Sequence, residues 1–198
     1  MNDMATLRNL LRLARDTVTN PREGATTVLS FAPNRQALWL MFALVVVTSL
    51  MMGEIVALLT DMPDGPMTGP FVQSPLALGL VQAAFLFIMI HVVHHVGRFF
   101  GGTGSLEEAA LLVIWLQFIF ICIQVIQIVA LLIIPPIAGL VTLLAIGLFF
   151  WLLVNFIAVL HGFTSLGLVF VTSLLVGFGM LVLMSIVLSA LGLAVPSA

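Results

Sequence analysis

Five long apolar runs follow one another along this chain, separated by short segments rich in turn-forming residues. The runs cover residues 37–59, 71–96, 106–134, 135–160 and 166–193. Each is long enough to cross a bilayer, because about 20 helical residues at ~1.5 Å each span a hydrocarbon core of roughly 30 Å. Unbroken runs exclude the alternating pattern of a membrane β-barrel. The pattern therefore predicts five transmembrane helices.

The composition agrees with this pattern. Hydrophobic residues make up 62% of the 198 residues and charged residues 7%, whereas charged residues are about 25% of a soluble protein. The single cysteine, Cys122, cannot form an intrachain disulfide. We therefore predict an all-α integral membrane protein with two parts: an amphipathic N-terminal segment, residues 1–35, and a five-helix transmembrane domain, residues 36–198.

The N-terminal segment has the spacing of an amphipathic helix. Its apolar residues recur at helical intervals, at Met4, Leu7, Leu10, Leu11, Ala14 and Val18, while another face carries Arg8, Arg12 and Arg15. This pattern favours a helix that lies in the membrane interface. A solvated arm without lipid contact is the alternative. Asn20-Pro21 ends this helix, and Pro21 suits the first position of a second short one.

A glycine-rich stretch between the second and third runs is predicted to reverse the chain. Residues 97–105 contain Gly101, Gly102 and Gly104, which accept a positive φ at no steric cost. Ser105, followed three positions later by Glu108, is a capping box for the third helix. No strand precedes these glycines and no Gly-Lys-Ser/Thr follows them, so they do not indicate a phosphate-binding loop. We call residues 97–105 the tip.

The arginines predict the orientation in the membrane. All six basic residues are arginines, and in a five-span protein all of them fall on one side: Arg8, Arg12, Arg15, Arg22, Arg35 and Arg98. The positive-inside rule then places the N-terminus and the tip in the cytoplasm. The absence of lysine and tyrosine hints at a GC-rich bacterial genome, which suggests the bacterial inner membrane.

Several motifs together resemble a known family. They are the arginine-bearing start with Asn20-Pro21, Trp39 in the first span, the tip sequence of residues 97–109 that continues into Trp115-Leu-Gln117, and His161-Gly-Phe163. This combination resembles bacterial members of the Yip family, the Rab-GTPase-interacting membrane proteins. The resemblance implies five transmembrane helices, a cytoplasmic N-terminus and, in eukaryotic relatives, a trafficking or membrane-organising role. It assigns no functional residues here.

Histidines form the first candidate site. His91, His94 and His95 stand at i, i+3 and i+4 near the end of the second helix, and His161 lies at the same membrane level. Together they have the residue types of a zinc site. Proton or substrate handling is a second interpretation, because ionisable residues in a membrane are often functional. A third is that they are interfacial histidines that bond to carbonyl oxygens or headgroups.

The tip and its flanks form a second candidate site, for lipids or protein partners. Arg98 beside Phe99 and Phe100 suits contact with lipid headgroups, and Glu107 and Glu108 lie at the same level. We expect membrane lipids and protein partners at the cytoplasmic face, and no nucleic acid. Small residues on the fifth helix, such as Ser173 and Gly177, suit close packing within the bundle or in a homo-oligomer.

Glu54 is the one carboxylate well inside a predicted span. It is a candidate proton or ion site, or else it is protonated, reaches outward to water, or bonds to a neighbour such as Gln82. The amide side chains within the predicted spans are expected to join helices by hydrogen bonds: Gln82, Gln117, Gln124, Gln127 and Asn155. Three of them, Gln117, Gln124 and Gln127, also share one stripe of the third helix.

These observations predict a non-enzymatic membrane protein that organises partners or lipids at the cytoplasmic face. The sequence contains no recognisable catalytic arrangement and implies no cofactor. The alternative is a small transporter or channel for protons or metal cations that uses Glu54 and the histidines at positions 91, 94 and 95. Such a protein would need the glutamine stripe to connect two polar sets that lie roughly half a bilayer apart.

Overall fold

The computed structural model describes residues 7–60 and 74–190, and in these ranges the chain is helical with short connections. The seven helices are α1 (Leu7–Thr19), α2 (Pro21–Leu29), α3 (Arg35–Thr60), α4 (Pro75–Phe99), α5 (Leu106–Ile133), α6 (Pro135–His161) and α7 (Leu166–Ala190). Five of them, α3 to α7, are long and apolar enough to cross a membrane. The prediction of an all-α protein with five membrane spans is confirmed.

The helix ends follow local sequence signals. Ser105 accepts a hydrogen bond of 3.2 Å from the Glu108 amide, and the Glu108 carboxylate accepts one of 2.7 Å from the Ser105 amide, so the predicted capping box is formed. Pro21 and Pro135 stand at the starts of α2 and α6, where a missing N–H costs nothing. The second span begins at Pro75, after its cap Ser74, and the earlier part of the predicted run lies outside the described residues.

The core lies around α5. This helix packs against α2, α3, α4 and α6, and its N-terminal half is buried almost continuously from Ala109 to Leu116. Most large side chains on the outer faces of the other spans are apolar and exposed, as expected for helices that are surrounded by lipid. The protein thus has a packed centre at one end of the bundle and an apolar periphery.

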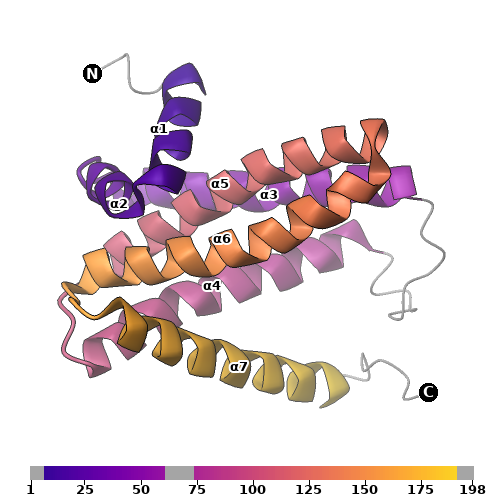
Figure 1. The fold of residues 1–198 in the computed structure, drawn as a ribbon. Coiled ribbons are helices and arrows are strands. Elements are labelled where there is room, and N and C mark those ends of the chain that lie inside the picture. Colours follow the sequence, from indigo (N-terminus) through magenta and orange to yellow (C-terminus); the bar gives the residue numbers. More distant parts are fainter. Residues whose placement is uncertain (1–6, 61–73, 191–198) are drawn as a thin grey trace.

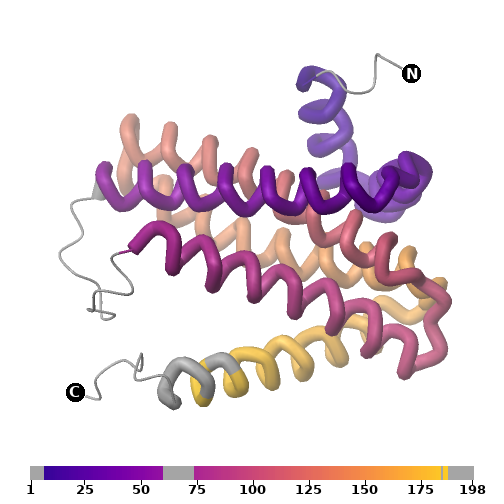
Figure 2. Tube along the Cα trace, turned by 180° about the vertical axis from the view of Figure 1, so that it is seen from behind, coloured from indigo at the N-terminus to yellow at the C-terminus, as the bar shows by residue number. Residues whose placement is uncertain are grey.

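Both short helices lie at that same end. Figure 1 shows α2 beside the ends of the long helices, with α1 running across the direction of the spans. The α4–α5 tip and the α6–α7 turn are at this end too, and the view from behind agrees (Figure 2). We call it the tip end. Each of the six arginines lies on a helix, or on a helix terminus, that is located here.

Candidate functional site

His161 holds the tip against α6. Its ring is buried, with 3% of the residue exposed, and its Nε2 lies 3.0 Å from the carbonyl oxygen of Val93 on α4. Its Nδ1 accepts a hydrogen bond of 3.3 Å from the amide of Gly104. A neutral imidazole has one donor and one acceptor, so the tautomer with hydrogen on Nε2 satisfies both contacts. The ring also stacks on Phe163. One side chain therefore joins α4, the tip and the α6–α7 turn.

Glycines provide the room that this ring occupies. A Cβ atom on Gly97 or on Gly102 would overlap the His161 ring, and one on Gly104 would overlap α6. Among the glycines of the tip, a positive φ is found at Gly101, at 86°. The prediction that these glycines adopt a positive φ is therefore right for Gly101. It is wrong for Gly102 and Gly104, where glycine is needed because α6 lies so close.

The three histidines of α4 form a row of ring contacts. The centroids of His91 and His95 are 6.0 Å apart, and those of His94 and His95 are 4.8 Å apart. His91 also pairs through Nδ1 with the carbonyl of Phe87 at 2.9 Å. His161 does not join them, because both of its nitrogens bond to the backbone. Within residues 7–60 and 74–190, no group of three or more His, Cys, Asp or Glu side chains is placed to hold a metal ion.

The predicted contact residues of the tip lie at its outer surface. Phe99 is 84% exposed and Phe100 53% exposed, and their rings meet edge to face. Arg98 is exposed in the last turn of α4, and Glu107 and Glu108 are exposed in the first turn of α5. The structure brings these five residues to the same end of the bundle. Glu108 also has a structural role in the capping box.

The N-terminal helix is docked on the bundle by a buried hydroxyl group. Thr17 is fully buried, donates to the carbonyl of Leu13 at 2.7 Å, and accepts a hydrogen bond of 3.3 Å from Nε1 of Trp115 on α5. A Cβ on Gly24 would overlap Thr17, so Gly24 of α2 lies directly against Thr17 of α1. The sequence pattern did not predict this contact. The one feature that could have indicated it is a threonine, Thr17, within the apolar face of the helix.

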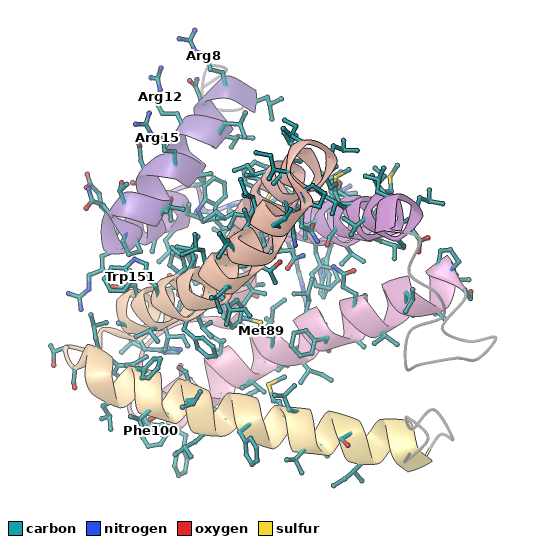
Figure 3. The ribbon with its side chains drawn as sticks, turned by 45° about the vertical axis from the view of Figure 1, so that its right-hand side comes forward. Arg8, Arg12, Arg15, Met89, Phe100 and Trp151 are labelled. Carbon is teal, nitrogen blue, oxygen red and sulfur yellow. The ribbon has the colours of Figure 1, made fainter. Side chains whose placement is uncertain are left out.

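The other face of α1 is exposed. Leu7 is 65% exposed and Leu11 is 45% exposed. Arg8, Arg12 and Arg15 are exposed as well, and Figure 3 shows all three extending from α1 away from the long helices. The α1 helix runs across the spans (Figure 1). Its exposed leucines and its exposed arginines therefore lie next to each other at the tip end.

Three of the predicted amides pair with hydroxyl groups of other helices, whereas the Oε1 atom of Gln124 is buried without a hydrogen-bond partner. Ser49 on α3 is 4% exposed and accepts hydrogen bonds from the amide nitrogens of Gln82 on α4 and Gln117 on α5. Gln127 bonds instead to Thr142 on α6, at 2.6 Å. Gln117 and Gln127 thus join α5 to different neighbours, as interhelical hydrogen bonds do in membranes.

Of the other two predicted polar residues, Asn155 differs from expectation. Asn155 is buried but bonds to the carbonyl of Trp151 in its own helix, so it does not join two helices. Glu54 is partly exposed in the half of α3 away from the tip end. The Gln82 amide that could have paired with Glu54 bonds to Ser49.

The fold defines the class of protein, and a comparison with known families then defines the family. This is a helical membrane protein with five apolar spans, whose ionisable side chains gather mostly at one end. The family model for the Yip1 domain matches residues 15–187, which is most of the chain, and the protein belongs to that family. The resemblance drawn from the sequence is confirmed. No curated protein and no solved structure matches the chain.

Proposed function

We propose that this protein organises anionic lipids, and protein partners held near them, at the cytoplasmic face of a bacterial inner membrane, without catalysing a reaction. The observation that carries the proposal is the docked α1. Its arginines face outward while Thr17 and Trp115 hold its other side to the bundle. A cationic helix that is fixed to a membrane-embedded core presents its charges at a constant depth.

Lipid attraction follows from where the charges lie. Each arginine near an anionic surface contributes about 1 kcal/mol of attraction, and three of them share α1. The exposed leucines of the same helix suit insertion at the boundary of headgroups and acyl chains. Phe99 and Phe100 extend the apolar surface at the tip. Protein partners would meet this surface from the aqueous side.

The intrinsic tryptophan fluorescence of the protein can test whether anionic lipids gather around it. Trp39 and Trp151 are 46% and 50% exposed, and Figure 3 shows Trp151 near the end that carries α1. In vesicles, a brominated anionic phospholipid should quench their fluorescence at least about twofold more than a brominated zwitterionic one, given about 1 kcal/mol per arginine. The change of Arg8, Arg12 and Arg15 to glutamine should remove the difference.

The matched control keeps the charge. A protein with lysine at the same three positions should retain the stronger quenching by anionic lipid, and high salt should weaken it, because the Debye length shrinks from about 8 Å at 0.15 M to about 3 Å at 1 M. Equal quenching by both lipids in the wild-type protein would contradict the proposed lipid role. So would a glutamine variant that behaves like wild type.

The orientation has its own test. In a Cys122→Ser background, a cysteine at Gly65 or Ser197 should react in intact cells with a membrane-impermeant thiol reagent, whereas a cysteine at Thr103 should react only after the cells are opened. The expectation rests on the arginines at the tip end and the positive-inside rule. Labelling of the Thr103 variant in intact cells would reverse the orientation.

A further inference from the structure

An apolar groove separates α7 from α4 and α6. Its volume is about 480 Å³, and its walls include Met89 and Val93 of α4, Phe149 and Leu153 of α6, and Gly177 of α7. Among the described residues that line it, none is charged. The side-chain oxygens in the groove belong to four hydroxyl residues of α7 and the turn before it: Thr164, Ser165, Thr172 and Ser173.

The groove exists because α7 packs loosely. Its main contacts are with α6, and Figures 1 and 2 both show it diverging from the other helices away from the tip end. A Cβ placed on Gly177 would meet no atom within 4 Å, although a small residue there would allow close packing. Leu175, outside the groove on the same helix, is 67% exposed. Phe178, which lines the groove, is 68% exposed as well.

We propose that the groove binds one acyl chain of a phospholipid from the leaflet on the tip side. Water is a poor occupant, because apolar cavities offer it too few hydrogen-bond partners. A transmembrane helix about 10 Å wide and roughly 30 Å long fills on the order of 2,000 Å³, far more than the groove provides. The volume lies within the roughly 300–1,000 Å³ of small-molecule sites, and an acyl chain is narrow enough to enter.

The polar groups lie where the headgroup of such a lipid would be. Thr164 and Ser165 are exposed at the tip end of the groove, and Arg98 stands in the last turn of α4, which forms one wall. The arginines of α1, α2 and α3 are at this end as well. The site therefore matches an amphiphile with an apolar tail and an anionic head. This match holds whichever side of the membrane the tip faces, so the inference does not depend on the proposed function.

A photoreactive lipid tests the groove directly. The full-length protein, in vesicles that contain phosphatidylglycerol with a diazirine in one acyl chain, should form lipid adducts at Met89, Val93 or Met180. Gly177→Leu places a side chain at a groove-lining position whose Cβ would meet no atom within 4 Å. It should lower the adduct yield at these residues by roughly tenfold, which corresponds to about 1.4 kcal/mol of binding free energy. Thr172→Leu, at another lining position, should act in the same direction.

Gly179→Leu is the matched control. Gly179 also has open space at its Cβ and lies on the same helix, but it does not line the groove, so the adduct yield should stay at the wild-type value. Adducts that form equally at Leu175 and are insensitive to Gly177→Leu would overturn the proposal, because they would report ordinary surrounding lipid. A photoreactive amino acid at Met89 that captures a second copy of the protein would also overturn it.

Discussion

Adding one methyl group at Gly97 should destabilise the folded protein by about 1–3 kcal/mol, the range for overpacking a close-packed core. The new Cβ would overlap the His161 ring. This ring cannot easily move aside, because hydrogen bonds to Val93 and Gly104 hold it from two sides. The loss is expected even though alanine favours a helix over glycine by up to roughly 1 kcal/mol. Unfolding of the detergent-solubilised Gly97→Ala protein, followed by tryptophan fluorescence, measures it.

A double-mutant cycle separates this contact from a general effect of alanine. His161→Ala alone should also destabilise, because it leaves a cavity and removes the partners of two buried backbone groups. In that background, Gly97→Ala should cost little, since the methyl group then has room. Gly147→Ala, in α6 with no atom within 4 Å of the new Cβ, should be neutral or stabilising. Additive losses from the Gly97 and His161 changes would contradict the proposed packing.

The second large effect is expected where α1 meets α2. Gly24→Ala would drive a Cβ into the backbone and side chain of Thr17, and should release α1 from the bundle. Loss of the bond between Thr17 and Trp115 costs about 1–3 kcal/mol for the buried group left unpaired. Trypsin cleavage after Arg15 should therefore rise by roughly tenfold or more, because local opening controls cleavage and 1.4 kcal/mol is a factor of ten.

The chain offers simple controls for this experiment. It has six arginines and no lysine, so trypsin has few sites, and cleavage after Arg98, which is exposed and lies outside α1, serves as an internal reference. Gly53→Ala, in α3 with open space at the Cβ, should leave cleavage after Arg15 unchanged. Should Gly24→Ala and Gly53→Ala give the same pattern, the docking of α1 through Thr17 would be refuted.

The spans and their ends could be predicted because they depend on local properties. A run of apolar residues long enough to cross a bilayer must be helical, since its backbone groups have no water to bond to. The capping box of Ser105 and Glu108 and the proline at position 135 likewise act over three or four residues. The family could be recognised from the same linear motifs, and its model matches residues 15–187.

The candidate site was predicted only in part. From the sequence, Arg98, the two phenylalanines and the glutamates were correctly predicted to lie at one end of the bundle, because each stands next to a helix terminus. It grouped His161 with the histidines of α4 by membrane depth alone. Depth does not determine the direction in which a side chain points, and His161 points into the tip, where the backbone occupies both of its nitrogens.

By itself, the sequence determined five helical spans, the capping box of the third span and the end of the bundle at which the arginines gather. Those features depend on hydropathy and on neighbours a few residues apart. The tertiary structure alone decided that Thr17 meets Trp115, that Ser49 joins two glutamines, and that α7 stands off to leave a groove. Such contacts join residues far apart in the chain, and they depend on how apolar helices of nearly uniform surface rotate against one another.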